Sequence, residues 1–271
     1  MISVSIIGSG NVATHLFKAF TKTKSVTVKQ WFSRDISKIS SYKNDVDVID
    51  DFSKLTEADI YIIAVSDDAI PEVSEALPFE NRLVVHTSGS VSLYKLDKKN
   101  RRGVFYPLQT FSKEAKVDFK TIPLCIETIG KKDYPLLKSL AEALGSSSHK
   151  INGDQRKALH LAAVFVNNFS NQMYRIAHEI TEMEGVEFDI LKPLILETAK
   201  KVQDLSPYMA QTGPAKRNDN KTIKRHLKQL ESEEHKTIYS LLTESIKKTH
   251  GTSILRRSSE QASSVTKTIE T

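Results

Sequence analysis

A glycine-rich run near the amino terminus carries the clearest chemistry in this chain. It reads Gly8-Ser9-Gly10-Asn11-Val12-Ala13 and has the form G-x-G-x-x-A, between an apolar segment and a helical pattern. In such a turn the first glycine permits a tight bend, the second lets a pyrophosphate approach the backbone, and the alanine lets helix and strand pack closely. Free N–H groups at the helix N-terminus also favour phosphate. The predicted phosphate-binding residues are Gly8, Ser9, Gly10, Asn11 and Val12, and the alternative is an ordinary strand-to-helix turn.

The end of the next apolar segment indicates which dinucleotide binds. NAD sites usually carry an acidic residue there, which binds the ribose 2′-hydroxyl. This chain instead reads Phe32-Ser33-Arg34-Asp35. A hydroxyl and a guanidinium can bind a 2′-phosphate through charge-assisted hydrogen bonds. We therefore predict that Ser33 and Arg34, assisted by Lys38, select NADP. Asp35 either pairs with Arg34 or caps the next helix, and Arg34 could also be a solvated loop charge.

Two further segments end in small polar residues. Val65 and Ser66 follow an apolar run, and ligands of open parallel sheets lie beyond the carboxyl ends of the strands. We expect both residues to border the cofactor. The loop His86-Thr87-Ser88-Gly89-Ser90 ends another run, so Ser88 and Gly89 are candidates for contact with a substrate. The alternative for this loop is a turn followed by a helix cap at Ser92.

The elements that position these residues alternate in the first half of the chain. Short apolar segments predict strands, and several are apolar on both faces, which is typical of a parallel sheet covered by helices. The predicted strands are residues 4–7, 26–32, 60–65, 83–86, 104–106 and 122–126, and the predicted helices are residues 12–20, 70–77 and 134–144. This order predicts an α/β fold with a Rossmann-type doubly wound parallel sheet.

The pattern changes at about residue 152 to helical periodicity. Apolar residues recur at steps of three and four from Leu159 to Ile180, which predicts one long helix. Further helices are expected at residues 189–205, 221–230 and 234–248, with a loop at 206–220 and a stop at Gly251. The predicted domains are therefore residues 1–151, a dinucleotide-binding domain, residues 152–257, an all-helical C-terminal domain for substrate binding and dimerisation, and residues 258–271, a disordered tail.

The motifs together resemble a family of putative NADP oxidoreductases. Its members pair a Rossmann-like domain with a helical domain of unknown function, related to the C-terminal domain of 6-phosphogluconate dehydrogenase. The chain more distantly resembles pyrroline-5-carboxylate reductase and deazaflavin-dependent NADP reductases. The matching segments are Gly8–Ala13, Ser33-Arg34, the loop at residues 86–90, Tyr106-Pro107-Leu108-Gln109-Thr110-Phe111, the helix around His160, and residues 212–219. The resemblance implies an NADP cofactor and a homodimer formed through the helical domain.

The helical domain holds the candidate catalytic residues. Hydroxyacid dehydrogenases of this type place a Lys-x-x-Asn pair early in the first long helix; here Lys157 matches, but His160 stands where the asparagine would be. A histidine can donate a proton to a carbonyl or imine as hydride arrives. We predict His160 as the catalytic residue, with Lys157 and Asn167 as second candidates and Arg217 as a residue that closes over the substrate. The alternative is a structural, hydrogen-bonded histidine.

Composition excludes several classes of protein. The net charge is +6 and is spread evenly, because residues 1–150 carry 21 basic and 18 acidic side chains and residues 151–271 carry 18 and 15. We therefore expect no nucleic-acid partner, although a pI near 9.1 leaves a basic binding module as a minor alternative. Single Cys125 allows no internal disulfide, and no metal motif, signal sequence or 20-residue apolar span is present. We expect no metal, no membrane association and a cytoplasmic location.

These observations predict an NADP-dependent oxidoreductase that transfers a hydride between NADP(H) and a small polar substrate. The alternative from another class is a non-enzymatic NADPH-binding sensor, in which the nucleotide controls a partner interaction. Turnover distinguishes the two hypotheses, because a sensor would bind NADPH without oxidising it.

Overall fold

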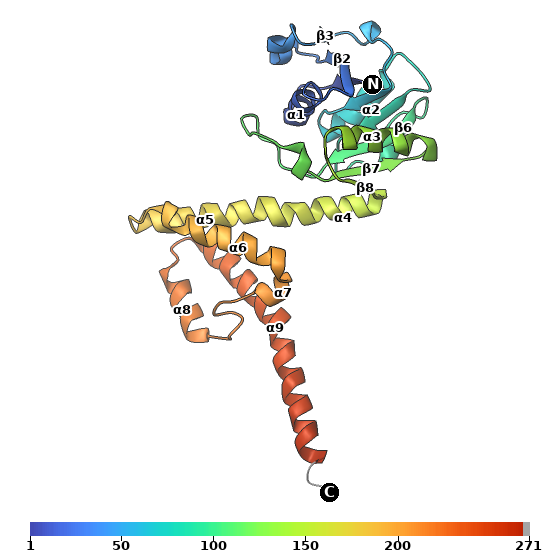
Figure 1. Ribbon diagram of the computed structural model, residues 1–271. Helices are drawn as coiled ribbons and strands as arrows, with labels where there is room; N and C mark the ends of the chain where they lie inside the picture. Colours follow the sequence, from blue (N-terminus) through green and yellow to red (C-terminus); the bar gives the residue numbers. More distant parts are fainter. Residues whose placement is uncertain (268–271) are drawn as a thin grey trace. The chain divides into compact units, whose positions relative to one another are not determined.

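The first half of the chain folds around one eight-stranded sheet (Figure 1). The structure, a computed structural model, describes residues 1–267, with side chains described up to residue 251. The strands are β1 (Ile2–Ile7), β2 (Val26–Phe32), β3 (Asp47–Ile49), β4 (Ile60–Ile63), β5 (Leu83–His86), β6 (Arg101–Pro107), β7 (Leu124–Thr128) and β8 (Ser148–Lys150). Their order in the sheet is β3-β2-β1-β4-β5-β6-β7-β8. The predicted Rossmann-type α/β fold is confirmed.

The sheet is parallel except at one strand pair. β7 runs antiparallel to β6, with Tyr106 opposite Cys125, and all other neighbours are parallel. A parallel crossover needs a dozen or more residues and usually a helix. The segment between β6 and β7 forms only a three-residue 3₁₀ turn, Phe119–Thr121, so the chain returns antiparallel. The predicted parallel sheet thus contains one antiparallel pair.

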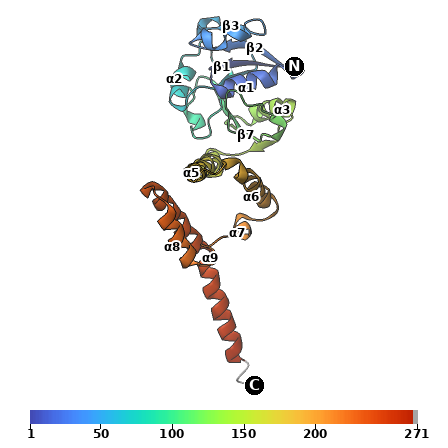
Figure 2. The same cartoon turned by 90° about the vertical axis from the view of Figure 1, so that its left-hand side faces the viewer.

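Helices cover both faces of the sheet (Figure 2). Buried side chains of α1 (Asn11–Phe20) and α3 (Tyr134–Ala143) belong to one apolar core, and those of α2 (Ile70–Glu75) belong to the core on the other face. Trp31 is fully buried in the first core, stacked on Phe17 with ring centroids 4.6 Å apart. Short 3₁₀ turns η1 to η6 complete the connections: Ile36–Tyr42, Phe52–Lys54, Asp67–Ala69, Leu93–Lys95, Phe119–Thr121 and Lys131–Asp133.

After β8 the described chain is helical. Its elements are α4 (Gly153–Ala163), the π-helix η7 (Val164–Phe169), α5 (Ser170–Met183), the 3₁₀ turn η8 (Phe188–Leu191), α6 (Lys192–Asp204), α7 (Pro207–Ala210), α8 (Asn220–Gln229) and α9 (Glu233–Lys267). The predicted single helix from Leu159 to Ile180 therefore contains a π-helical segment. The predicted loop at residues 206–220 holds the short α7, and Gly251 lies inside α9 rather than at its end.

The chain divides into two compact units. We call Met1–Phe169 the α/β unit and Ser170–Thr271 the helical unit. Strands end at Lys150 and α4 begins at Gly153, close to the domain boundary predicted at residue 152, but α4 and η7 group with the sheet. The predicted domain limits remain predictions. The predicted disordered tail, residues 258–271, lies outside the residues whose side chains the structure describes. Residues 268–271 are not described at all.

Candidate functional site

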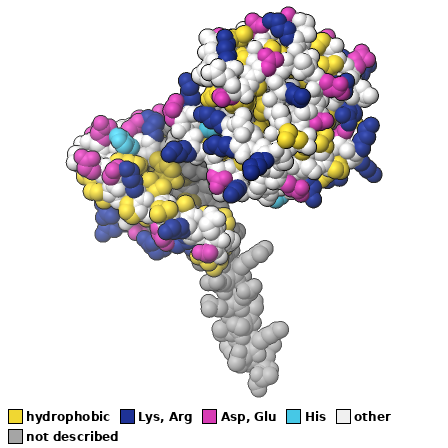
Figure 3. Space-filling model, turned by 45° about the horizontal axis from the view of Figure 1, so that its top comes forward, with side chains coloured by type: hydrophobic (Ala, Val, Ile, Leu, Met, Phe, Trp, Pro, Cys, Tyr) yellow, Lys and Arg dark blue, Asp and Glu magenta, His cyan; other side chains and the backbone are white. Residues whose placement is uncertain are grey.

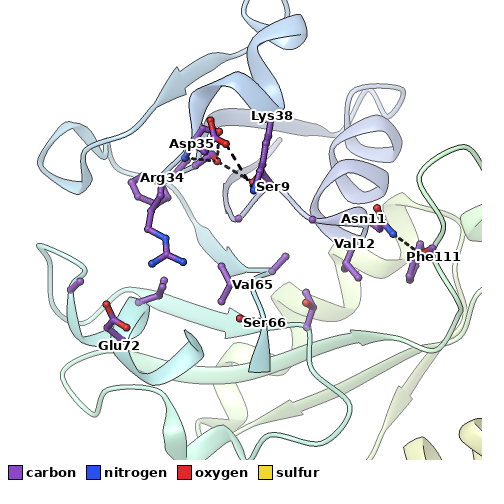
Figure 4. Close-up of a pocket in the computed structure, with 18 of the residues that line it drawn as sticks. Ser9, Asn11, Val12, Arg34, Asp35, Lys38, Val65, Ser66, Glu72 and Phe111 are labelled. Carbon is purple, nitrogen blue, oxygen red and sulfur yellow. Dashed lines mark hydrogen bonds and ion pairs between the residues drawn. The ribbon is translucent and has the colours of Figure 1, made fainter. Parts of the chain in front are cut away.

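The carboxyl ends of β1, β2 and β4 border one pocket (Figure 4). Its volume is about 680 Å³. All nine residues that the sequence predicts to bind the cofactor line it: Gly8, Ser9, Gly10, Asn11, Val12, Ser33, Arg34, Val65 and Ser66. We call it the first pocket. Its position follows from topology, because parallel strands on either side of the β1–β4 switch point open a crevice at their carboxyl ends.

The two glycines of the motif have different structural roles. Gly8 has a φ of +119°, and a Cβ there would overlap the Ala64 carbonyl oxygen of the neighbouring strand. Gly10 lines the pocket, and a Cβ built on it would have no heavy atom within 4 Å. Gly8 is thus required by the fold, whereas Gly10 leaves open space in front of the backbone. This open backbone at the start of α1 fits a pyrophosphate.

Polar side chains at the end of β2 form one wall of the first pocket. The Ser33 hydroxyl donates to Ser9 Oγ at 3.0 Å, and Arg34 extends into the pocket, as Figure 4 shows. Asp35 Oδ1 accepts the Ser37 N–H at 3.1 Å and caps η1. The side-chain hydrogen bond from Ser37 lowers the pKa of Asp35. Of the two roles predicted for Asp35, the structure shows the cap. Lys38 Nζ lies 3.9 Å from Asp35 Oδ2, so Arg34 is the cation of this wall that makes no ion pair with a described residue.

The loop after β6 lies against the glycine motif. Asn11 Nδ2 donates to the Phe111 carbonyl at 2.8 Å, and His15 Nε2 lies 2.9 Å from the Ser112 carbonyl. The side chains of Gln109 and Phe111 line the first pocket. This loop, residues 108–118, therefore closes the side of the pocket that faces α1.

A second pocket lies beside the same loop within the α/β unit, and its volume is about 540 Å³. It is lined by Tyr106, Leu108, Gln109, Thr110, Leu159, His160, Ala162, Ala163, Val164, Val166, Asn167 and Asn168. Gln109 lines both pockets. The two cavities thus share a wall, and ligands in them would be neighbours.

Tyr106 and His160 are bonded to each other in the second pocket. The Tyr106 hydroxyl lies 3.1 Å from His160 Nδ1, which joins β6 to α4. Burial raises the pKa of Tyr106 to about 12, so its phenol is protonated at neutral pH. Gly89 makes room for the pair, since a Cβ there would lie 2.6 Å from His160 Nδ1 and 2.8 Å from Tyr106 Cζ. The pair holds the imidazole in one orientation.

A buried arginine supports this arrangement. Arg156 is fully buried, and its Nη1 donates to the carbonyls of Ser88, Gly89 and Val91 at 3.2, 3.2 and 2.7 Å. Its Nη2 binds the Glu127 carboxylate at 3.0 Å. The guanidinium therefore ties the first turn of α4 to the loop after β5 and to β7.

The other predicted residues fall in several places. Lys157 is exposed and does not line the second pocket, whereas His160 and Asn167 do. Ser88 and Gly89 line neither pocket; the Ser88 hydroxyl accepts the N–H groups of Ser90 and Val91, and Ser92 caps the turn that follows. Arg217 lies exposed in the helical unit, before Asp219, which caps α8. Direct contacts of these residues with a substrate stay predictions.

Three residues of the site were not predicted. Tyr106 and Arg156 act through partners distant in sequence, and Gln109 lines both pockets. Tyr106 and Gln109 belong to the run Tyr106–Phe111, which matched the family pattern without an assigned role, and no signal pointed to Arg156.

The described residues hold no group of three or more His, Cys, Asp or Glu side chains placed to bind a metal ion. Over the same residues, none of the helices combines the length and apolarity that a membrane span requires.

Comparison with known proteins identifies the family. Residues 3–89 match the domain described as NADP oxidoreductase coenzyme F420-dependent, and residues 122–246 match a domain of unknown function, DUF2520. A putative NADP oxidoreductase from Bacteroides fragilis is 37% identical, with 91% of this chain and 98% of that chain covered and a TM-score of 0.82. The chain belongs to this NADP oxidoreductase family. It is accordingly an NADP-dependent oxidoreductase.

More distant structures share the fold of this oxidoreductase. A protein from Thermotoga maritima is 19% identical over 92% of this chain and 99% of that chain, with a TM-score of 0.71. A pyrroline-5-carboxylate reductase from Coxiella burnetii is 17% identical over 94% and 97%, with a TM-score of 0.56. No curated protein matches the sequence.

Proposed function

We propose that this oxidoreductase transfers a hydride between NADP(H) and a small polar substrate with a carbonyl or imine group. NADPH supplies the hydride when bound. The observation that carries the proposal is the shared Gln109 wall between the first pocket and the pocket that holds Tyr106 and His160. A cofactor that fills the first pocket would place its reactive end next to a substrate in the second.

The cofactor assignment rests on the lining of the first pocket. We assign the phosphates to the backbone of Gly8–Val12 and the 2′-phosphate to Ser33, Arg34 and Lys38. Arg34 makes no ion pair with a described residue, so its guanidinium is free to bind phosphate. Val65 and Ser66 would border the bound nucleotide.

His160 is our first candidate for the proton transfer. Tyr106 bonds its Nδ1, and no described residue makes a hydrogen bond to Nε2. A neutral or protonated imidazole held in this way can give or take a proton at a substrate oxygen or nitrogen. Asn167 lines the same pocket and would orient the substrate, while Lys157 remains a second candidate.

We further propose a homodimer formed through the helical unit. Many large apolar side chains are exposed on this unit, and Figure 3 shows them gathered at its surface. They include Met183, Ile190, Leu194, Leu196, Met209, Leu241 and Leu242. Large exposed apolar patches are typical of interaction surfaces, and a second copy is the partner that this chain always has available.

A calorimetric titration with NADPH and NADH tests the cofactor site. We expect micromolar NADPH binding and much weaker NADH binding. In Arg34→Ala the preference should fall at least tenfold, because a charge-assisted hydrogen bond to the 2′-phosphate is lost. Lys24→Ala is the matched control, since Lys24 is exposed and does not line the first pocket. Failure of wild-type protein to bind either nucleotide would refute the proposed function.

The sensor hypothesis gains no support from the comparisons, because the related proteins are named as oxidoreductases or reductases. The cytoplasmic location stays a prediction.

A further inference from the structure

The second pocket is lined by uncharged side chains. Of the described residues that line it, none is Asp, Glu, Lys or Arg. Six are apolar: Leu108, Leu159, Ala162, Ala163, Val164 and Val166. The polar ones are the hydroxyls of Tyr106 and Thr110, the amides of Gln109, Asn167 and Asn168, and the His160 imidazole. The pocket can therefore form hydrogen bonds with a polar group of a ligand and apolar contacts with the rest of that ligand.

Three charged side chains of neighbouring segments do not line the pocket. Arg156 is fully buried and directs its guanidinium to three carbonyls and to Glu127. Lys157 is exposed and does not line the pocket. Asp67 accepts a hydrogen bond from Ser90. None of these three charged side chains is among the described residues that line the pocket.

This lining decides between substrate classes. A carboxylate or phosphate is usually recognised by Arg or Lys, because desolvating an unpaired charge is costly. A carbonyl or imine needs only a neutral donor and apolar contacts, and 540 Å³ suits a small organic molecule. We infer that the substrate of this oxidoreductase is an uncharged carbonyl or imine compound with an apolar body, not a carboxylate or a phosphate ester. The inference rests on the proposed function, since it names the substrate class of the same site.

Matched substrate pairs test the inference. Acetophenone is compared with 4-acetylbenzoate, and 2-methyl-1-pyrroline with 1-pyrroline-2-carboxylate, on full-length protein saturated with NADPH. We measure NADPH oxidation for each compound, and binding to the NADP⁺ complex by ligand-observed NMR. We expect the uncharged member of each pair to have at least a tenfold higher kcat/KM or affinity. Equal or better use of the charged members would overturn the inference.

A charge introduced at the pocket provides the second test. Val166 lines the pocket and is 77% exposed, so Val166→Lys should fold and shift the preference toward the carboxylates at least tenfold. Ala158→Lys is the matched control, because Ala158 is exposed on the same helix and does not line the pocket. An equal shift in both variants would contradict the inference.

Calorimetric titration of the same protein preparations with NADPH distinguishes a failure of the proposed function from a failure of the substrate-class inference. Loss of NADPH binding would refute the proposed function. Normal NADPH binding with no measurable binding of any uncharged compound would overturn the substrate class alone.

Discussion

The imidazole of His86 is a titratable group sealed inside the α/β unit. It is fully buried at the end of β5, and its Nδ1 accepts the Ser88 N–H at 3.1 Å. Burial, with a smaller effect from the nearby positive charge of Arg156, lowers the pKa of His86 to about 3. The ring is therefore neutral, and the loop that carries Gly89 depends on this neutral acceptor.

Acid should therefore destabilise the protein through His86. The unfolded pKa is near 6.5, so between about pH 6.5 and 3 the unfolded state binds a proton that the folded state does not. The stabilising contribution is complete above pH 6.5 and declines as pH falls, by up to about 1.4 kcal/mol per pH unit. Urea unfolding at several pH values above about 5 measures this slope. In His86→Asn the amide oxygen can replace Nδ1 as the acceptor, but the side chain no longer titrates. The number of protons taken up on unfolding, which sets the slope of stability against pH, should therefore be lower by up to one. Identical slopes for the wild type and the variant would contradict the assignment.

Local and long-range residues of the site differed in how well the sequence predicted them. The glycine motif and Ser33-Arg34 follow single strands directly, so their shared pocket follows from parallel topology alone. Tyr106 meets His160 across 54 residues, and Arg156 reaches Ser88 across 68. Such contacts depend on how α4 packs on the sheet, which no local pattern encodes.

At the scale of elements, α4 is anchored to the sheet by one ion pair. Arg156 Nη2 binds Glu127 and joins the first turn of the helix to β7, and Nη1 binds carbonyls of the loop after β5. Asn152 caps the helix in a capping box with Gln155. Because His160 lies one turn further along α4, its position depends on this anchor.

Removing one partner of the anchor should be more costly than removing both. We expect Arg156→Leu to lower the free energy of unfolding by about 3–5 kcal/mol, because it leaves a carboxylate and three carbonyls without their donor. The double variant Arg156→Leu/Glu127→Leu should recover part of this loss. Lys138→Leu breaks an exposed pair with Glu142 and should cost less than about 1 kcal/mol. Urea denaturation measures all three, and an additive double variant would contradict the coupling.

The sequence predicted those helices and strands whose apolar pattern is long enough to show a periodicity. The strands β3 and β8 have only three residues each, and β8 is largely exposed, so neither shows a detectable alternation of apolar and polar residues. The π-helix at Val164–Phe169 breaks the regular 100° spacing that one continuous helix from Leu159 to Ile180 would have. Gly251 is tolerated inside α9, since glycine weakens a helix without ending it.

For the whole molecule, the exposed apolar surface of the helical unit predicts assembly. We expect light scattering at micromolar concentration to give twice the chain mass of 30.4 kDa. The double variant Leu194→Lys/Leu241→Lys should lower the mass toward that of one chain, because both side chains are more than half exposed and apolar. Ile129→Lys, on the α/β unit, is the control. A wild-type monomer would count against the dimer.

The loop after β6 has a consequence for the binding of the two ligands. Its Phe111 carbonyl is bound by Asn11 of the glycine motif, while Gln109, two residues earlier, faces both cavities. A nucleotide that displaced this loop would therefore also change the lining of the second pocket. If bound nucleotide changes the affinity for substrate by some factor, thermodynamic linkage requires bound substrate to change the affinity for nucleotide by the same factor.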